Sequence, residues 1–504
     1  MSMVGFGRYQ IQLFLLTGLG WAADNIWLQG VAIILPQIQK ELHPARVEFA
    51  TMSLFIGLIV GASTWGVLAD LIGRRLSFNI TLFICAVFGI AAGGANNFTT
   101  LCALISCMGF GVGGNLPVDG AIFLEVLPRT HQWYLTLLSV WWALGQLFAS
   151  LIAWPLISNF SCGTPDNCRK EDNMGWRYTF YVLGGVTAIM WILRYVVFDL
   201  QESPKYLVAK GRDGEAIKVL EHIAHKNGRT ITLTLESLQG GAKERTGQAQ
   251  TVGHLSTYQV FRNAFSSFSL SHVTPLFSTR RLAINTSITI VLWGLIGLAY
   301  PLFNGFITLY LSTQITGDPP STYRTYRDYS IISVLGVPGS VVACLVVDYT
   351  RKNQNKFAMG GRKLTMAIST ALTGVFLFLF TTSKTQEAEL GYSLASGFTQ
   401  NAMYGVLYAY TPEVFPAPHR GTGDALCSAF NRICGVLAPV IKIVTTNPDG
   451  SAVGGTANGY VVEVVQVPEP YTRQRPIFVS ATLFLVASVL MLLLPIETAG
   501  KAAL

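Results

Sequence analysis

The chain contains twelve long apolar runs separated by polar loops, and this pattern restricts it to one architecture. A helix that crosses a bilayer needs about 20 apolar residues. Because six runs precede a polar stretch at 201–281 and six follow it, the pattern predicts an all-α membrane protein of about twelve transmembrane helices in two pseudo-symmetric six-helix bundles. The predicted runs lie near 11–36, 48–69, 77–95, 100–126, 134–158, 178–199, 282–312, 328–348, 363–382, 391–412, 422–444 and 475–495.

Composition supports a single membrane unit. Of the 504 residues, 51% are hydrophobic and 12% are charged, whereas soluble proteins average about 25% charged residues. We therefore expect an N-terminal bundle at 1–200, a cytoplasmic central loop at 201–281 and a C-terminal bundle at 282–504, rather than several soluble domains.

The distribution of positive charge predicts the orientation. The net charge of +8 does not indicate nucleic-acid binding, because Lys and Arg concentrate on one set of alternating short loops. The 201–281 stretch falls on the same side and holds 11 Lys/Arg against 6 Asp/Glu. The positive-inside rule then predicts that both termini and the central loop are cytoplasmic. We expect a multi-pass protein of the plasma membrane that acts as a monomer.

Two polar loops carry specific features. Ile217, Leu220 and Ile223 recur at helical spacing, which predicts a short amphipathic helix in the central loop. Cys162 and Cys168 lie in a hydrophilic loop on the predicted exterior, where oxidising conditions favour a disulfide. No cysteine pair has the spacing of a zinc site, so no metal is expected.

The loop between the second and third runs has a distinctive order of residues. Gly66 is followed by Asp70, Gly73, Arg74 and Arg75 in the pattern G-x-L-A-D-x-x-G-R-R. Glycine permits a tight turn, and arginine at headgroup level marks the cytoplasmic side and can bind a carboxylate. This loop resembles the signature loop of the major facilitator superfamily. An ordinary basic turn that only sets topology is the alternative.

Three motifs recur in the same order in the two halves. The motif pairs are Asp70…Arg75 with Asp348…Lys363, Glu125-Val-Leu-Pro128 with Glu413-Val-Phe-Pro416, and Glu202-Ser-Pro204 with Pro495-Ile-Glu497. The last pair resembles motifs of the sugar-porter branch of the superfamily. Together with an acidic residue in the first run, the set also looks like the synaptic-vesicle-glycoprotein-related and organic-ion transporters.

The resemblance implies that acidic and arginine side chains pair near the cytoplasmic helix ends and hold the two bundles closed. The sugar-porter pattern expects an arginine where this chain has Gln132, and Arg129 is the nearest substitute. The expected cytoplasmic gating residues are Gly66, Asp70, Gly73, Arg74, Arg75, Glu125, Arg129, Asp348, Arg362, Glu413 and Arg420.

Three charged residues inside the apolar runs are candidates for contact with a solute or a proton. A charge near the bilayer centre costs about 2.5–3.5 kcal/mol, so Asp24, Asp119 and Arg432 each need a partner, a water-filled cavity or a proton. Asp24 is expected to bind a cation, take up a proton or pair with Arg432. Arg432 is expected to bind an anionic group or to neutralise a carboxylate. A purely structural ion pair or carboxylate is the alternative for each.

Uncharged polar and aromatic residues extend this candidate site. Tyr and Trp stack on flat or apolar substrates and offer one hydrogen bond, although ordinary packing between helices is the alternative for each. These further candidates are Asn25, Gln29, Asn115, Trp142, Gln146, Asn304 (next to an expected kink at Pro301), Asn401, Tyr404 and Tyr408.

These features predict secondary active transport of a small polar solute, an organic ion or another metabolite, by alternating access and with proton coupling. The expected partners are that solute, H⁺ and the lipid bilayer, without cofactor or nucleic acid. A sugar or phosphate-type facilitator and a receptor that binds without transporting are alternatives. No Gly-x-x-x-x-Gly-Lys-[Ser/Thr] loop occurs and the seven histidines do not cluster, so we expect neither an ATP-driven pump nor an enzyme.

Overall fold

The computed structural model describes residues 5–72, 74–128, 134–163, 168–197, 201–209, 212–231, 273–312, 320–352, 361–416, 420–445 and 469–498. Within these ranges the chain is almost entirely helical, and a long helix coincides with each of the twelve apolar runs. The predicted all-α class is confirmed.

Six long helices occupy the N-terminal half of the described chain. They are α1 (Arg8–Leu42), α2 (Glu48–Ile72), α3 (Arg74–Gly93), α4 (Phe98–Val126), α5 (Tyr134–Asn159) and α6 (Gly175–Ile192). A π-helical turn extends α6, and two short helices follow it. These shorter elements are η2 (Lys170–Asp172), η3 (Leu193–Val197), α7 (Pro204–Ala209) and α8 (Asp213–Lys226).

The C-terminal half repeats this arrangement. Its elements are η4 (Thr274–Phe277), α12 (Arg280–Phe303), η5 (Asn304–Phe306), α13 (Ile307–Leu311), α14 (Thr322–Lys352), α15 (Gly361–Thr382), α16 (Gln386–Val414), α17 (Arg420–Thr445) and α18 (Glu469–Leu493). Several helices are longer than the predicted runs. For example, α14 and α16 begin five or six residues earlier, because their first turns are polar and an apolar pattern does not detect them.

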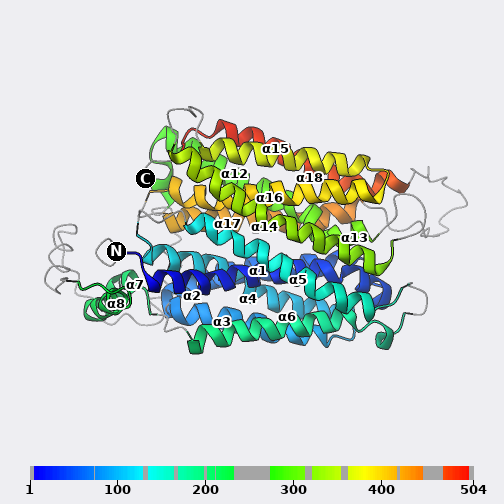
Figure 1. The fold of residues 1–504 in the computed structure, drawn as a ribbon, viewed down its shortest axis with the longest axis horizontal. Helices are drawn as coiled ribbons and strands as arrows, with labels where there is room; N and C mark the ends of the chain where they lie inside the picture. The colour runs from blue at the N-terminus through cyan, green and yellow to red at the C-terminus, as the bar shows by residue number, and fades with distance from the viewer. Residues whose placement is uncertain are drawn as a thin grey trace, which may run out of the picture.

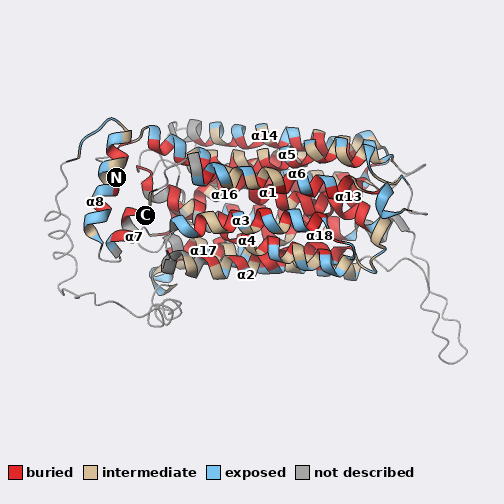
Figure 2. Ribbon diagram, turned by 90° about the horizontal axis from the view of Figure 1, so that it is seen from below, coloured by how far each residue is buried: buried red, intermediate tan, exposed pale blue. Residues whose placement is uncertain are grey.

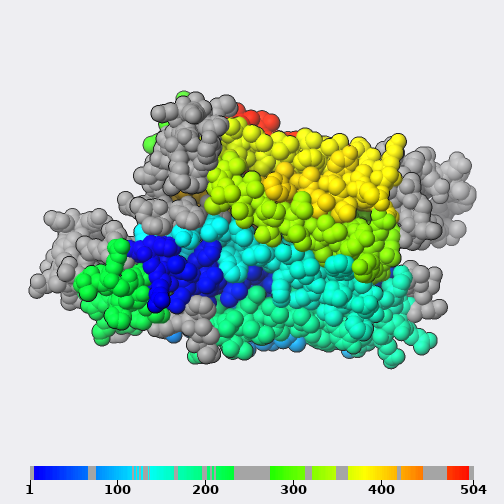
Figure 3. Space-filling view, viewed as in Figure 1, coloured from blue at the N-terminus to red at the C-terminus, as the bar shows by residue number. Residues whose placement is uncertain are grey.

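The two halves form two groups of helices that meet along the length of the molecule (Figures 1 and 3). Between them, α5 packs against α14, and α2 packs against α17. The start of α1, the end of α18 and the helices α7 and α8 lie at one end, which we call the termini end. The opposite end carries the Cys162–Cys168 disulfide, with a Cα–Cα distance of 5.7 Å, and is called the disulfide end.

The outer surface of the bundle is apolar. Exposed positions recur along the outward faces of the helices (Figure 2), and large apolar side chains there, such as Ile189, Leu345 and Val489, are more than half exposed. Within the described chain, nine helical segments are long and apolar enough to cross a membrane. The helices α1, α6 and α16 are not among them, and each carries polar residues that the bundle buries. The surface is therefore suited to lipid rather than to water.

The seventh predicted run is not one continuous helix. Its first part, α12, ends at Phe303, and the 3-10 turn η5 leads into α13. Pro301 has no N–H with which to bond the carbonyl four residues earlier, so the helix is weakened here. The α-helix does not end at Pro301 itself: it gives way to the 3-10 turn three residues later, which places Asn304 in the turn.

The amphipathic helix predicted in the central loop is present as α8, but its buried face differs from the expected one. Ile223 is buried as predicted, whereas Ile217 and Leu220 are only half-buried. Ala216 and Val219 are buried in addition. Smaller side chains face the neighbouring helices because α8 lies close against α7 and the start of α1. The larger Ile217 and Leu220 therefore lie at the edge of this contact.

The docking of α8 against α1 is held by a side chain just past the helix. Asn227 accepts a hydrogen bond from the Tyr9 backbone N–H at 3.1 Å and donates one to Gln10 Oε1 at 2.9 Å. The first turn of α1 thereby satisfies backbone donors that have no partner within the helix. The central segment is anchored to the N-terminal bundle through this contact.

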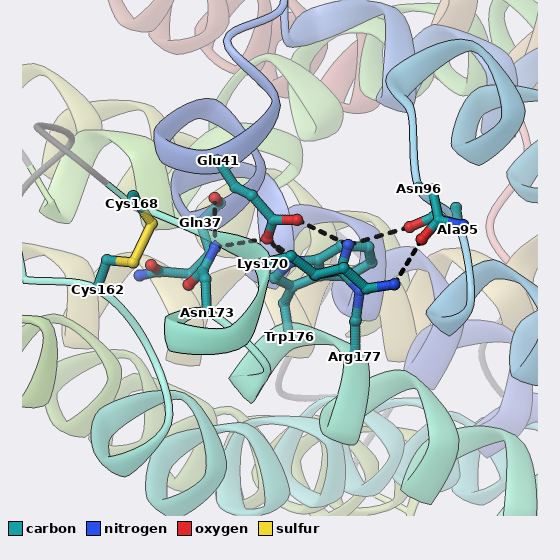
Figure 4. A network of polar contacts seen from close by, with 10 residues as sticks. All are labelled: Gln37, Glu41, Ala95, Asn96, Cys162, Cys168, Lys170, Asn173, Trp176 and Arg177. Carbon is teal, nitrogen blue, oxygen red and sulfur yellow. Dashed lines mark hydrogen bonds and ion pairs between the residues drawn. A yellow bond between two sulfur atoms is a disulfide. The ribbon is translucent and has the colours of Figure 1, made fainter.

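At the disulfide end, a buried carboxylate gathers the loops of the N-terminal bundle (Figure 4). Glu41, in the last turn of α1 beyond the predicted membrane run, forms two hydrogen bonds with Arg177, at 2.7 and 2.8 Å. Trp176 Nε1 and Asn173 Nδ2 also donate to it. Burial opposes the ionised form, but these hydrogen bonds outweigh it, so the pKa of Glu41 lies below its ordinary value.

Lys40 connects the disulfide loop to the other half of the molecule. Its Nζ donates to the Cys162 and Gly163 carbonyls, both at 3.1 Å. It also reaches Thr322 Oγ1, at the start of α14, at 3.5 Å. One ammonium group therefore joins the disulfide loop to the C-terminal half.

Candidate substrate site

The first helix places a carboxylate deep inside the bundle. Asp24 is 1% exposed, and its Oδ1 accepts a hydrogen bond from Asn115 Nδ2 of α4 at 2.9 Å. The structure thus brings these two sequence candidates together. One neutral hydrogen bond does not compensate for removing a carboxylate from water. A proton or a nearby positive charge must supply the remainder.

Asp119, one turn beyond Asn115 on α4, forms a fully buried ion pair. Its Oδ2 lies 2.9 Å from Arg194 Nη2, and neither side chain is exposed. The guanidinium also donates to the Phe78 carbonyl at 2.9 Å and lies 3.6 Å from the centroid of the Phe78 ring. Each charge is neutralised by the other without a ligand, although Asp119 Oδ1 and Arg194 Nε are buried without hydrogen-bond partners among the described residues. The geometry favours the structural alternative for Asp119.

The sequence interpretation missed Arg194. It lies in η3, inside the sixth apolar run, so the cost of burying a charge that singled out Asp24 applies to it equally. The absence of a side chain at Gly20 of α1 makes room for the pair. A Cβ at that position would overlap both Asp119 Oδ2 and Arg194 Nη2.

Arg432 of α17 reaches across to the N-terminal half. Its Nη1 donates to the Gly113 carbonyl of α4 at 2.8 Å. The residue four positions after Gly113 is Pro117, which has no N–H, so this carbonyl lacks its usual helical donor and is free to accept. Among the described residues, the guanidinium makes no other hydrogen bond. Arg432 and Asp24 lie within electrostatic range of each other but do not form an ion pair.

The same arrangement recurs nearer the disulfide end. Thr308 Oγ1 of α13 donates to the Ala32 carbonyl of α1. Ala32 precedes Pro36 by four residues, so its carbonyl is also without a helical donor. Two bonds between the halves thus end on carbonyls that a proline leaves free.

Tyr408 of α16 is the centre of an aromatic cluster. Its ring centroid lies 4.9 Å from both Trp21 and Trp293, 6.0 Å from Tyr404 and 6.5 Å from Trp142. Trp21 and Trp142 come from the N-terminal half, and the other three come from the C-terminal half. We call these five residues the Tyr408 cluster. Trp21 and Trp293 were not sequence candidates, whereas Trp142 was, because it shares a helix face with Gln146.

The charged and aromatic groups meet at Tyr408. This residue is within electrostatic range of both Arg432 and Asp24. The site therefore presents one positive group, one acidic group and a set of rings at the boundary between the halves.

Gln29 lies two turns from Trp21 along α1 and bonds to two helices of the other half. Its Nε2 donates to the Tyr300 hydroxyl at 2.7 Å, and its Oε1 accepts from the Tyr329 hydroxyl at 2.6 Å. Gln146 of α5 lies beside Tyr329. Gln29 and Gln146, both sequence candidates, therefore meet around a tyrosine that sequence reasoning missed.

Two predicted asparagines have partners within their own half. Asn25 Nδ2 donates to the Trp142 carbonyl at 2.7 Å and so holds α1 against α5. Asn304 Nδ2, in the turn η5, donates to Gln400 Oε1 at 2.8 Å. The Gln400 Nε2 is buried without a hydrogen-bond partner among the described residues.

Asn401 is not brought into this site. Its Nδ2 donates to the Gly397 carbonyl one turn earlier on the same helix, at 2.9 Å. The side chain lies next to Gly336 of α14. Although Asn401 shares a stripe with Tyr404 and Tyr408 on α16, this local hydrogen bond turns it to the edge of the stripe.

At the termini end, two of the gating candidates form an ion pair with each other. The Arg362 guanidinium of α15 forms an ion pair with the Glu413 carboxylate of α16, and both side chains are largely buried. Arg75 is exposed at the start of α3. The side chains of the remaining gating candidates lie outside the described set, and Gly73 and Arg129 lie outside the described residues altogether. These remaining candidates are Gly66, Asp70, Arg74, Glu125, Asp348 and Arg420.

Comparison with known proteins identifies the family. A model described as Major Facilitator Superfamily matches residues 13–360. The chain is 44% identical to MFS siderochrome iron transporter 1 of Ceriporiopsis subvermispora, over 99% of this chain and 90% of the relative. It is 27% identical to the synaptic vesicle 2-related protein of Rattus norvegicus, over 88% of this chain and 74% of the relative.

A solved structure has the same fold. The proton:xylose symporter XylE of Escherichia coli aligns with a TM-score of 0.67 over 98% of each chain, at 15% identity. At that identity the likeness concerns the fold alone. The resemblance to the synaptic-vesicle-related transporters is therefore confirmed at the level of sequence, and XylE confirms the fold. This chain belongs to the Major Facilitator Superfamily and is a secondary transporter of small solutes rather than an enzyme.

Proposed function

We propose that this chain carries a small organic ion across the membrane by alternating access, coupled to a proton that Asp24 binds. The observation that carries the proposal is that Asp24 and Arg432, from opposite halves, are both buried without forming an ion pair with each other. Buried charges in membrane helices are costly and are usually retained for function. A relative motion of the halves changes the solvent access of both groups.

The contacts between the halves support alternating access. The bonds of Gln29 to Tyr329, of Thr308 to Ala32 and of Lys40 to Thr322 lie between the middle of the bundle and the disulfide end. They favour a conformation that is closed at the disulfide end. Each is a single hydrogen bond with a net contribution of roughly 0.5–1.5 kcal/mol. Contributions of this size favour the closed conformation but still allow the protein to populate the open one.

We assign the termini end to the cytoplasm and the disulfide end to the exterior of the plasma membrane, with the chain acting as a monomer. The excess of Lys and Arg in the 201–281 stretch supports this orientation, and so does the Cys162–Cys168 disulfide, since disulfides persist on the oxidising side. In this orientation the Arg362–Glu413 pair lies at the cytoplasmic side, and we assign the gating motifs to opening and closing that side.

Uptake into proteoliposomes containing the full chain tests the proposal. The labelled probes are benzoate, choline, xylose, phosphate and a ferric siderochrome, each measured with and without an inward proton gradient. We expect gradient-driven accumulation of an organic ion in the wild type. Asp24→Asn should abolish accumulation yet retain exchange, whereas Glu215→Gln, on the exposed face of α8, should behave as wild type.

Three other results would contradict the proposal. Exchange or equilibration of an organic ion that does not respond to the gradient indicates a facilitator, and gradient-independent movement of xylose or phosphate alone indicates the sugar or phosphate-type alternative. Saturable binding without flux for any bound probe indicates a receptor.

A further inference from the structure

We infer that the central site takes a flat aromatic monoanion, with its carboxylate on Arg432 and its ring in the Tyr408 cluster. This inference rests on the transport function proposed above and names the class of its substrate. It follows from the charges, the free donors and the rings that the two halves bring together.

The sign of the substrate charge follows from an asymmetry between the two buried ions. A carboxylate such as Asp24 loses its charge by taking a proton, whereas a guanidinium such as Arg432 does not lose a proton in proteins. When Asp24 is ionised, the two opposite charges lie within electrostatic range and offset each other. When a proton and an anion enter together, Asp24 becomes neutral and the anion offsets Arg432. A cation would instead leave an uncompensated positive charge in the bundle.

The Asp119–Arg194 pair does not alter this balance. Its two charges are 2.9 Å apart and cancel each other, and its guanidinium is further bonded to the Phe78 carbonyl. The loaded site, with neutral Asp24 and a monoanion on Arg432, is then electrically neutral. A dianion would exceed the positive charge available.

Arg432 has donors to offer such an anion. Its guanidinium carries five N–H groups, and only Nη1 is bonded to a described residue, the Gly113 carbonyl. The remaining edge has the planar fork that matches a carboxylate with two parallel hydrogen bonds. Carboxylates are therefore preferred over halides or other spherical anions.

The shape of the substrate follows from the rings around Tyr408. The ring centroids of Trp21, in one half, and Trp293, in the other, each lie 4.9 Å from the ring centroid of Tyr408. Both pairs are edge-to-face, and a further ring can join such a cluster by its edge or by its face. An aromatic body can therefore contact both halves at once, whereas a chain-like aliphatic acid or a sugar would not use these faces.

Two buried donors remain for a polar substituent. Trp21 Nε1 and Gln400 Nε2 are buried without partners among the described residues. Both side chains are more than nine-tenths buried, and an unmet donor of this kind is unfavourable. An acceptor on the ring of the substrate would satisfy Trp21 Nε1, which belongs to the Tyr408 cluster, and a water carried with the substrate would satisfy Gln400 Nε2, two turns from Tyr408 along α16.

Equilibrium binding to the purified full chain in lipid nanodiscs tests the inference, with tryptophan fluorescence as the signal. Four probes separate charge from shape: benzoate, cyclohexanecarboxylate (equal charge, saturated ring), benzamide (neutral) and benzyltrimethylammonium (cationic). We expect benzoate to bind about tenfold more tightly than cyclohexanecarboxylate, the scale of aromatic contacts. The neutral and cationic probes should give no saturable binding.

Two variants assign the contacts. Arg432→Gln should abolish benzoate binding, whereas Arg280→Gln, exposed at the start of α12, should leave it unchanged. Tyr408→Leu should retain carboxylate binding but reduce the ratio between benzoate and its saturated analogue to nearly one. Because this ratio compares two ligands on one protein, it does not depend on how much of the variant folds.

Equal binding of the two acids, tighter binding of the cation, or no binding of benzoate would each overturn the inference. These outcomes are separate from failure of the proposed function. If benzoate binds with the expected selectivity but is never accumulated with a proton gradient, the transport proposal fails and the site assignment stands. If a non-aromatic ion is accumulated and benzoate is not bound, the transport proposal stands and the inference fails.

Discussion

The Glu497 carboxylate accepts a hydrogen bond from the backbone N–H of Lys363, at 3.2 Å, in the first turn of α15. The equivalent glutamate of the other half does the same, since Glu202 accepts from the Arg75 N–H at 3.3 Å in the first turn of α3. Each glutamate also accepts from the N–H of the residue that follows it. The motif repeat found in the sequence is therefore a repeat of one physical device, a carboxylate that caps the third helix of its half.

Because Glu497 caps α15, removing its carboxylate should destabilise the folded protein. Glu497→Ala should lower the free energy of unfolding by about 1 kcal/mol, because the backbone donors at the start of α15 lose their acceptor. Glu497→Gln keeps an acceptor oxygen and should lose less. Thermal unfolding in detergent measures both, and equal losses for the two variants would contradict a capping role.

Gly20→Ala should destabilise the N-terminal bundle. The added Cβ overlaps the Asp119–Arg194 pair, and overpacking of a close-packed core costs about 1–3 kcal/mol. Gly185→Ala on α6 is the matched control, since a Cβ there meets nothing within 4 Å. If both variants unfold at the same temperature, the pair does not depend on the space at position 20.

The Asp119–Arg194 pair should show strong coupling in a double-mutant cycle. Asp119→Leu or Arg194→Leu alone leaves an uncompensated buried charge and should cost about 3–5 kcal/mol. The double variant removes both charges and should recover most of that loss. Additive losses, measured by thermal unfolding, would show that the two side chains do not interact.

The network around Glu41 should make stability depend on acidity. The pKa of Glu41 lies below the ordinary glutamate value in the folded protein, so the unfolded chain takes up a proton first as the pH falls. The stabilisation by Glu41 is then complete above the ordinary value, near 4.5, and is lost as the pH falls through the lower folded value. The difference in unfolding temperature between the wild type and Glu41→Gln should therefore shrink below pH 4.5. A constant difference across this range would refute the assignment.

Lys40→Met should loosen the disulfide end. It removes the link from the disulfide loop to Thr322. A single hydrogen bond contributes roughly 0.5–1.5 kcal/mol, so its loss should raise the equilibrium constant for local opening of this end about twofold to tenfold. Amide hydrogen exchange in the first turns of α14 should accelerate by about this factor. Arg212→Met on the exposed α8 pair controls for loss of a surface charge and should leave that exchange unchanged.

The cost of burying charge allowed much of the site to be predicted. Asp24, Asp119 and Arg432 were identified because an ionised side chain in an apolar run must have a reason to be there. Arg194 satisfies the same rule and was missed, since it lies near the end of its run. The partners themselves were not predictable: Gln29 meets Tyr329, 300 positions away, and only the packing of the two halves brings them together.

The helices were predictable for a related reason, and their ends were not. An apolar run of membrane length leaves the backbone no alternative to a helix in lipid, so all twelve runs were found. Hydropathy carries no information on polar turns beyond the membrane, so α14 and α16 were predicted too short. The break after Pro301 depends on how η5 and α13 pack against α1, which a single sequence does not encode locally.

The two carbonyls that Pro36 and Pro117 leave free have a consequence for hydration. When the halves separate, the Ala32 and Gly113 oxygens exchange a side-chain donor for a water molecule, and no helical bond is broken. The net hydrogen-bond free energy then changes little. The two prolines thus allow α1 and α4 to exchange these contacts between the halves for water without losing a hydrogen bond of their own helices.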